Sequence, residues 1–380
     1  MEGNGENWFY FEGRIGMATN SFGKIFRITS FGESHGSEIG VVIDGCPSNI
    51  AIEIGGINEA LSRRKPGQSS LTTERKESDL ARITSGIFNG KTTGAPICIV
   101  VPNANQKSKD YDHLANVYRP SHADFTYDQK YSNRDHLGGG RASARITAGW
   151  VAAGAVAEQI LTHFHPVRIV SYVDQIYTLA YGGKPNPLSR TNVDRNKVRC
   201  PDDEIAAKME ACILEMKEDG NSVGGIIKTV IENCPIGLGD PLFEKLHANL
   251  AKAMMSINAV KGFSYGDGFE SVLKTGKESN DEWESTTEGQ LQTRSNHSGG
   301  IQGGISNGMD ILFSVAFKPT ASISKEQHTV TKDGANTKLQ ISGRHDPCVV
   351  PRAVPIVEAL SAIVLLDALL ANRALSKQIN

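Results

Sequence analysis

A stretch running from Arg134 to Gly154, RDHLGGGRASARITAGWVAAG, constrains this chain more than any other part of its sequence. Three consecutive glycines are followed by Arg141 and Arg145, and then by an apolar, alanine-rich run that is typical of a buried helix. Glycine lets a backbone approach a ligand closely, and a helix start presents unpaired amide groups and the positive end of the helix dipole. A glycine turn that only precedes a core helix is the alternative. We favour an anion-binding loop, because a guanidinium group is costly to bury without an anionic partner.

The balance of charge argues against a general polyanion binder. The formal net charge over 380 residues is −2, and the basic residues are concentrated in a few motifs that contain Gly, Ser and His. The six cysteines have no C-x-x-C spacing, so reduced thiols and no metal centre are expected. The most apolar run, 356–370, carries Glu358 and Asp367, so no membrane-spanning segment is expected either. These features predict a cytoplasmic protein that binds neither nucleic acid nor membranes.

The order of the predicted elements indicates one α+β domain. Residues 1–16 lack the basic start and cleavage site of a signal peptide, and Met17 follows them, so we interpret them as an added or disordered extension. Residues 17–380 show no internal repeat and no convincing linker, which favours a single domain. Hairpins come first, and strands and helices then follow without a regular βαβ alternation. This order argues for an α+β fold and against a dinucleotide-binding domain.

Residue periodicity predicts the main secondary structure. Alternating or β-branched residues indicate strands within 23–45, 81–102, 167–177, 223–235 and 309–319. Apolar residues at helical spacing indicate helices over 53–65, 201–219 and 241–257, and an apolar C-terminal helix that ends near Arg373. Residues 276–293 carry neither pattern, so we expect them to be disordered or mobile. The loops 103–118 and 276–296 are candidate covers over a site.

Two histidines lie in loops that are suited to chemistry. His35 stands with Glu33 and Ser34 between two glycines in the turn of a hairpin, a rigid placement that is typical of functional loops. His122 follows a proline that fixes an extended backbone, within reach of Asp124. We favour a functional role for His35 over a solvated surface position. For His122 two interpretations stay open: a surface hydrogen bond with Asp124, or an acid or base whose pKa its neighbours set.

Cations are concentrated outside ordinary helix surfaces. Arg63, Arg64 and Lys65 end a predicted helix, where cations suit the helix dipole, but three in a row exceed what capping requires and indicate a second anion-facing patch. Paired guanidinium groups bind carboxylate and phosphate with both charge and geometry. If the cations converge, the ligand therefore carries several negative charges. The others placed in this way are Arg119, Arg134, Arg141, Arg145, Lys318, Arg344 and Arg352.

Seven motifs, taken together and in order, resemble the chorismate synthase family. They are GESHG (32–36), RPSHAD (119–124), GGGRASARITAGWVAAGAV (138–156), SINAVKG (256–262), SNHSGGIQGGIS (295–306), KPTASI (318–323) and GRHDPC (343–348). The resemblance extends from Met17 to Leu375. It implies a single catalytic domain with a β-α-β sandwich fold, in which antiparallel sheets enclose a helical layer. It also implies a homotetramer with cofactor sites near subunit contacts.

The reaction that this resemblance implies is a lyase reaction. It converts 5-enolpyruvylshikimate 3-phosphate to chorismate and phosphate by a 1,4-anti elimination, the last common step of aromatic amino-acid biosynthesis in the shikimate pathway. The family needs reduced FMN although the reaction has no net redox change. NADPH is one candidate reductant, and a separate flavin reductase is another. The implied substrate carries two carboxylates and one phosphate, which matches the ligand that the set of arginines calls for.

Site residues follow from the resemblance position by position. His35 resembles the histidine proposed to protonate the departing phosphate, His122 the one proposed to act beside flavin N1, and Asp346 the acid proposed to assist proton removal through flavin N5. Substrate contacts are implied for Arg64, Arg119, Arg145 and Arg352. FMN-binding positions are implied for Arg141, Ala142, Ser143, Asn258, Ala259, Gly303, Lys318, Pro319, Thr320, Ala321, Ser322 and Arg344. The stretch 134–154 would then lie where the two ligands meet.

The chain departs from the family pattern at one position, and two alternative functions stay open. Many family members have an arginine where this chain has Ser70, and the nearest cations are Arg75 and Lys76. A phosphotransferase is the first alternative, but no Lys-Ser/Thr follows a glycine loop as in a P-loop, and clustered metal-binding acids are missing. The second is a flavin- or anion-binding protein without turnover.

Overall fold

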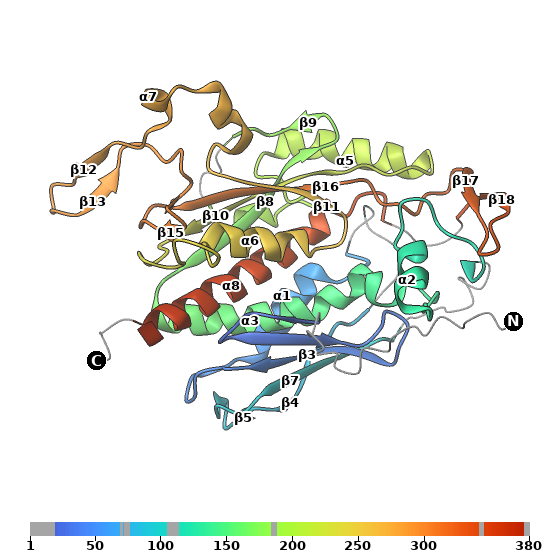
Figure 1. Cartoon of the computed structure of the whole chain (residues 1–380), viewed down its shortest axis with the longest axis horizontal. Helices are drawn as coiled ribbons and strands as arrows, with labels where there is room; N and C mark the ends of the chain where they lie inside the picture. The colour runs from blue at the N-terminus through green and yellow to red at the C-terminus, as the bar shows by residue number, and fades with distance from the viewer. Residues whose placement is uncertain are drawn as a thin grey trace, which may run out of the picture.

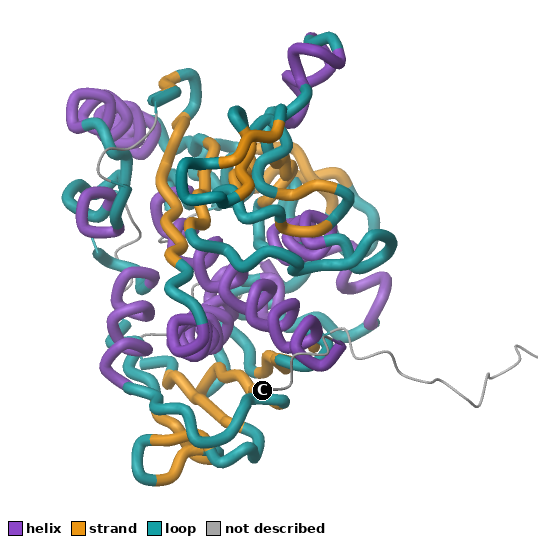
Figure 2. Tube along the Cα trace, turned by 90° about the vertical axis from the view of Figure 1, so that its left-hand side faces the viewer, coloured by secondary structure: helices purple, strands orange, loops and turns teal. Residues whose placement is uncertain are grey.

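The computed structural model of the chain describes residues 20–68, 71, 77–104, 114–183, 188–341 and 346–375. Two five-stranded antiparallel sheets enclose a layer of helices (Figure 1). Figure 2, turned by 90°, shows these helices between the two groups of strands. The predicted α+β fold, a sandwich of antiparallel sheets around a helical layer, is confirmed. The extension predicted for 1–16 lies outside the described residues.

The first sheet packs its β-branched side chains against the helices. In β3, Ile39, Val41 and Ile43 are fully buried, as the period of a strand requires when one face meets a core. A short hairpin of β5 (Ile87–Phe88) and β6 (Lys91–Thr92) connects β4 to β7. Both hairpins predicted from sequence are confirmed. In spatial order the strands are β1 (Ser21–Phe22), β2 (Arg27–Phe31), β3 (Glu38–Asp44), β7 (Ile97–Pro102) and β4 (Arg82–Ser85).

The second sheet closes the other side of the helical layer. In β16, Ile311, Phe313 and Val315 are buried and alternate with less buried residues. The strands predicted from β-branched residues in this half of the chain are confirmed. In spatial order they are β11 (Val260–Tyr265), β16 (Ile311–Phe317), β10 (Gly225–Glu232), β8 (Arg168–Ile176) and β9 (Leu179–Ala180).

Two long helices cross at the centre of the helical layer. A Cβ atom at Gly154 of α3 (Thr147–Phe164) would lie 2.3 Å from the Cβ of Ala359 in α8 (Val350–Leu375), so only glycine allows this approach. The glycine and alanine content of α3 thus serves helix packing. α1 (Ile54–Arg64) and α6 (Leu246–Met255) complete the layer, α6 starting later than the predicted residue 241.

The apolar helix α8 corrects one expectation. By length and composition it is long and apolar enough to cross a membrane, whereas the sequence was expected to contain no such segment. However, 83% of its most apolar stretch is buried inside the fold. Its two acids have partners in the chain: Glu358 pairs with Arg63, and Asp367 accepts the amide of Ile25 at 2.7 Å. α8 is therefore packed as a core helix.

The remaining elements lie outside the three layers. The prediction that 276–293 is disordered or mobile is wrong. The capping box of Thr275 and Glu278 starts α7 (Gly276–Ser279), and β12 (Trp283–Ser285) pairs with β13 (Leu291–Thr293) in a projecting hairpin (Figure 1). The other elements are α2 (Asp124–Tyr131), α4 (Arg190–Val193), α5 (Asp203–Glu218), η4 (Gly268–Leu273), β14 (Ile301–Gln302), β15 (Ile305–Ser306), β17 (Gln327–Val330) and β18 (Asn336–Leu339).

The glycine stretch also differs from its prediction in one respect. Gly138, Gly139 and Gly140 have φ angles of +62°, +83° and +49°, which favour glycine over any residue with a side chain. Two short 3₁₀ turns, η2 (Gly140–Ala142) and η3 (Ala144–Ile146), follow before α3 begins at Thr147. The glycines therefore form a separate loop ahead of the helix and do not lie at its N-terminus.

Candidate functional site

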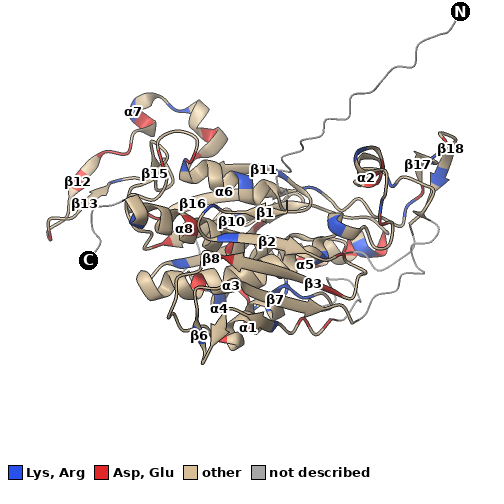
Figure 3. Cartoon of the chain, turned by 60° about the horizontal axis from the view of Figure 1, so that its bottom comes forward, with Lys and Arg blue, Asp and Glu red and all other residues tan. Residues whose placement is uncertain are grey.

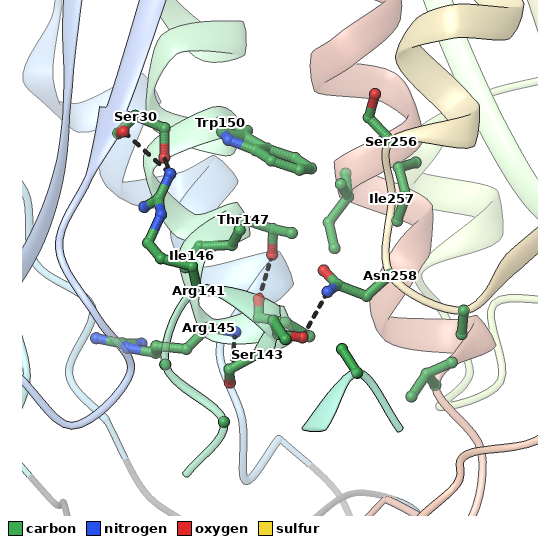
Figure 4. Close-up of a pocket in the computed structure, with 18 of the residues that line it drawn as sticks. Ser30, Arg141, Ser143, Arg145, Ile146, Thr147, Trp150, Ser256, Ile257 and Asn258 are labelled. Carbon is green, nitrogen blue, oxygen red and sulfur yellow. Dashed lines mark hydrogen bonds between the residues drawn. The ribbon is translucent and has the colours of Figure 1, made fainter. Parts of the chain in front are cut away.

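A cavity of about 1070 Å³ opens where the start of α3 meets the ends of α6 and β16. Small-molecule sites usually measure about 300–1,000 Å³, so this cavity has room for more than one small ligand. Its walls come from segments far apart in the sequence, namely 20–35, 64–66, 119–150, 252–259, 317–322 and 346–360. In Figure 4, Trp150 and Asn258 extend toward this space from opposite sides.

The glycine loop passes between the two candidate histidines. A Cβ atom at Gly138 would lie 1.9 Å from the His35 ring, and one at Gly139 would lie 3.4 Å from Nε2 of His122. Ser34 donates its hydroxyl proton to Gly138 O over 3.1 Å, and its Oγ is 2.9 Å from His35 Nδ1. Since the hydroxyl has one proton, the hydrogen of the second contact belongs to Nδ1. The loop therefore brings both imidazoles to one cavity.

Asp124 holds His122 and an arginine of the cavity wall. Nδ1 of His122 is 2.9 Å from Asp124 Oδ1, and Arg119 donates to the same carboxylate through Nε and Nη2, both over 2.8 Å. Burial alone would raise the pKa of Asp124, but the hydrogen bonds from Arg119 and His122 outweigh it and hold that pKa well below its usual range. Arg134 Nη1 lies 2.8 Å from the same carboxylate. Sequence suggested the His122 contact; the two arginine partners were not predicted.

Asp79 is a second buried carboxylate that was not predicted. It forms ion pairs with Arg64, over 3.1 Å, and with Arg145, and all three side chains are at most 3% exposed. Burial, together with the charges of Arg352 and Arg145, lowers the pKa of Arg64 to about 9, so Arg64 stays charged at neutral pH. Two guanidinium groups thus share one carboxylate, and the trio carries a surplus positive charge toward the cavity. Lys and Arg are otherwise interspersed with Asp and Glu along the chain (Figure 3).

The segment that leads into α8 contributes an acid, and the first turn of α8 contributes an arginine. Arg352 and Asp346 form an ion pair, and both line the cavity. Nε of Arg352 is buried and has no hydrogen-bond partner among the residues that the structure describes. A buried donor of this kind calls for a ligand or a water molecule. Arg344 and Ser70 lie outside the described residues, as do Arg75 and Lys76.

The opposite wall presents further groups without charge partners. Asn258 donates from Nδ2 to Ala142 O over 2.7 Å, while its buried Oδ1 lacks a partner within the described chain (Figure 4). Burial, together with the neighbouring charge of Lys261, lowers the pKa of Lys318. No carboxylate in the described ranges forms an ion pair with Lys318 or Lys252. This wall is suited to an anionic or polar ligand.

Arg141 lines the cavity but its guanidinium group is used elsewhere. It donates to Gly32 O and Ser30 O, each over 3.0 Å, and to Asn20 Oδ1 over 3.1 Å. These bonds fix the glycine loop to the first sheet, as Figure 4 shows for Ser30. The side chain of Arg141 therefore positions the loop, and a ligand would meet the rest of this segment.

Most predicted site residues meet at the cavity, and a few do not. Ala142, Ser143, Ala259, Thr320, Ala321 and Ser322 line it with the residues described above. Gly303, in the turn between β14 and β15, does not line this cavity, and neither does Pro319, although its neighbours do. Of the predicted patch 63–65, only Arg64 lines the cavity, because Arg63 pairs with Asp194 and Glu358.

Comparisons with known proteins agree with this site. A protein-family model described as chorismate synthase matches residues 26–370. The chain is 54% identical over 358 residues to the chorismate synthase of Christiangramia forsetii, covering 94% of this chain and 99% of that protein. It is 52% identical over 357 residues to the chorismate synthase of Cytophaga hutchinsonii, with the same coverage. A solved structure described as a crystal structure of chorismate synthase superposes with a TM-score of 0.71 and 30% identity, covering 92% of this chain and 93% of that one.

The match with the family is nearly complete in length, and it agrees with the fold and with the order of the seven motifs. Both named relatives are enzymes of one kind, and the chain covers 99% of each. The chain therefore belongs to the chorismate synthase family, the lyases of the shikimate pathway.

Proposed function

We propose that this enzyme converts 5-enolpyruvylshikimate 3-phosphate to chorismate and phosphate by a 1,4-anti elimination that depends on reduced FMN. The observation that carries the proposal is the glycine loop, which brings His35 and His122 to one cavity. The surplus positive charge of Arg64, Arg145 and Asp79 borders the same space. A substrate with two carboxylates and a phosphate needs that combination of proton donors and guanidinium groups.

The residues of the opposite wall fit a flavin mononucleotide. Asn258 Oδ1 is a buried acceptor without a partner in the described chain, and such an acceptor suits an N–H group of the flavin ring. Lys318 and Lys252 are cations suited to a phosphate, and Trp150 offers an apolar face. When bound, reduced FMN would supply electron density transiently to the substrate and recover it, which permits loss of phosphate without net oxidation.

Three residues of the chain would handle protons and charge. His35, with its Nδ1 directed to Ser34, would protonate the departing phosphate. His122, held by Asp124, would balance negative charge on the cofactor side of the cavity. Asp346 would take up the ring proton at its carboxylate, and its pairing with Arg352 keeps it at the cavity wall. Arg64, Arg119, Arg145 and Arg352 would bind the substrate's negative groups.

Replacing either histidine by alanine should lower turnover by about a hundredfold or more, because a general acid or base contributes about 10²–10⁴. His35→Ala and His122→Ala should leave the circular dichroism spectrum unchanged. Phosphate release under anaerobic conditions measures turnover. His163→Ala is the control, because His163 is exposed near the C-terminal end of α3 and does not line the cavity. A histidine whose loss leaves phosphate release near that of the wild type has no place in the mechanism.

One assay tests the proposed function as a whole. Purified enzyme is given 5-enolpyruvylshikimate 3-phosphate anaerobically with reduced FMN, and in parallel with oxidised FMN. Phosphate and chorismate should appear in equal amounts with reduced FMN, and neither with oxidised FMN. Turnover without flavin, or turnover that needs a nucleotide, would contradict the proposal. FMN uptake without phosphate release would support the alternative of a binding protein without turnover.

We further propose a homotetramer that works in the cytoplasm, with NADPH or a separate flavin reductase as the source of reducing equivalents. Large exposed apolar residues support an assembly, since Phe243 is 92% exposed and Phe269 and Val272 are each 80% exposed. Sedimentation equilibrium should give four times the mass of one chain. Anaerobic addition of NADPH and FMN to the purified enzyme distinguishes the two reductants, because only a chain that reduces its own flavin bleaches the flavin absorbance.

A further inference from the structure

We infer that Asp124 couples anion binding at Arg119 to protonation of His122, so that an anionic ligand in the cavity draws a proton from solvent onto the imidazole. Asp124 is in this role a positioning residue, because it acts through its two neighbours. The inference rests on the proposed function, since it takes Arg119 as a substrate contact and His122 as a residue that handles protons.

The geometry of Asp124 is that of a shared acceptor. Asp124 is the first residue of α2, and its side chain is 2% exposed. Oδ2 accepts the backbone amide of Arg119 over 3.0 Å and its Nε over 2.8 Å. Oδ1 accepts Nη2 of Arg119 over 2.8 Å and contacts Nδ1 of His122 at 2.9 Å, and Arg134 Nη1 lies 2.8 Å from it. One carboxylate oxygen is therefore shared by an imidazole and two guanidinium groups.

This sharing defines the resting state of His122. Because Asp124 is ionised and only accepts hydrogen bonds, the proton of the contact lies on Nδ1 of the imidazole. Burial lowers the pKa of His122; the hydrogen bond to Asp124 opposes this, and the charges of Arg119 and Arg134 add to the lowering, so the net shift is downward. His122 is therefore neutral at pH 7 in the ligand-free enzyme. Its ring lies against Gly139, and it lines the cavity.

The charges around this group determine what a ligand changes. An anion bound by Arg119 neutralises the guanidinium charge nearest to the imidazole and competes with Asp124 for its donors. Both effects favour the imidazolium, the first by removing repulsion and the second by freeing Oδ1 for Nδ1. The other charged groups near this hub are Asp128, Arg134 and Lys332 beside α2, Asp135 beside the glycine loop, and Glu33 and His35 on the hairpin turn. Of these groups, Arg134 also contacts the shared carboxylate, so its positive charge acts on His122 both before and after the anion binds.

The coupling has to be reciprocal, so the anion should bind more tightly once His122 is protonated. We expect the pKa of His122 to rise by about one unit on saturation, which corresponds to about a tenfold coupling. Anion affinity should therefore increase about tenfold as the pH falls through the pKa of His122 in the bound enzyme and then through its pKa in the free enzyme.

The experiment uses the full chain and 5-enolpyruvylshikimate 3-phosphate in the absence of flavin, so that no turnover occurs. Histidine ring protons are followed by NMR as a function of pH, with and without the ester. Calorimetry in two buffers of different protonation enthalpy counts the protons taken up. His297 is an internal control: its Nδ1 lies 2.7 Å from Asp267 Oδ2 beside Lys274, the same kind of group, and it does not line the cavity. Its titration should not move.

Two variants separate this role from a purely structural one. Asp124→Asn should lower the pKa of His122 further and make the ligand-linked rise smaller than in the wild type, since the carboxylate that Arg119 and His122 share is gone. Arg134→Gln should raise the pKa of His122 in the free enzyme, because one repelling cation is removed, and Arg134 does not line the cavity. The two variants should therefore shift the pKa of His122 in opposite directions. A general structural defect would not produce this pair of shifts. If Asp124→Asn fails to fold, Arg134→Gln still tests whether the charges around Asp124 set the pKa of His122.

The outcomes distinguish this inference from the proposed function. Heat of binding together with an unchanged His122 titration would overturn the coupling and leave the proposed function standing. Absence of binding, seen as no heat in either buffer and no ligand-induced change in any histidine ring signal, would overturn the proposed function, and the coupling with it. A rise of the His122 pKa on binding, with proton uptake and a constant His297 titration, would support both.

Discussion

Asp79→Asn is expected to lower the free energy of unfolding by about 3–5 kcal/mol, the usual effect of removing one partner from a buried ion pair. Asp79 compensates two arginines, Arg64 and Arg145, whose side chains are 1% and 3% exposed. Without the carboxylate, two like charges are left together in the interior. Asparagine is the suitable replacement, because Asp79 has a φ of +49° and asparagine tolerates this left-handed conformation. The change therefore removes charge with little added backbone strain.

Urea unfolding followed by circular dichroism measures the effect. Asp44→Asn is the matched control, because Asp44 pairs with Arg27 over 3.3 Å but both side chains are half exposed. Exposed pairs contribute about 0–1 kcal/mol, so the control should unfold close to the wild type. High concentrations of the anionic substrate should partly restore the Asp79→Asn midpoint, since a bound anion replaces the missing charge. Equal midpoints for the two variants would show that the arginines do not depend on Asp79.

Local patterns were sufficient to predict most of the fold. In the strands, side-chain period and burial coincide, as in Ile39, Val41 and Ile43, because each sheet has one face on the helical layer. The hairpin of β12 and β13 was missed since its residues are mostly polar and exposed. It is held by backbone pairing and by the capping box that precedes it, not by a core. Hydrophobic periodicity carries no information on such a segment.

The site could be predicted in its cations but not in their partners. Arg64, Arg119 and Arg145 lie in conspicuous motifs, and all three line the cavity. Asp79 lies 66 positions from Arg145 and in an unremarkable polar run, so no sequence spacing connects them. Asp79 also has a left-handed backbone conformation, and because the residue is not a glycine the sequence gives no sign of it. The carboxylates that hold the arginines were therefore visible only once the two sheets were brought together.

The glycine loop was recognised for the wrong reason. Its glycines were expected to open a helix N-terminus toward an anion, yet α3 begins only at Thr147. Gly138 has a steric function in the structure, because a side chain there would overlap the His35 ring, while the His122 ring lies at ordinary contact distance from a Cβ atom at Gly139.

Gly138→Ala is expected to lower turnover by up to about 10⁴-fold, the upper end of a general acid–base contribution. The new Cβ would lie 1.9 Å from Cε1 and Nδ1 of His35 and 2.7 Å from Oγ of Ser34. His35 must then leave its contact with Ser34, or the loop must move toward His122. Either displacement removes an imidazole from its place, and the second disturbs both. The loss should therefore equal or exceed that of His35→Ala.

The substitution also places a side chain at φ +62°, a strain of about 1–2 kcal/mol that has to be separated from the clash. Gly182→Ala provides the separation, because Gly182 has a φ of +65° and no atom lies within 4 Å of its added Cβ. Gly182→Ala should lose only the stability that the strain costs and keep anaerobic phosphate release, while Gly138→Ala should lose at least as much stability and also lose phosphate release. Equal turnover in the two variants would mean that His35 does not need its position against the glycine loop. The histidine would then have to act from elsewhere, and the proposed protonation of the departing phosphate would lose its structural basis.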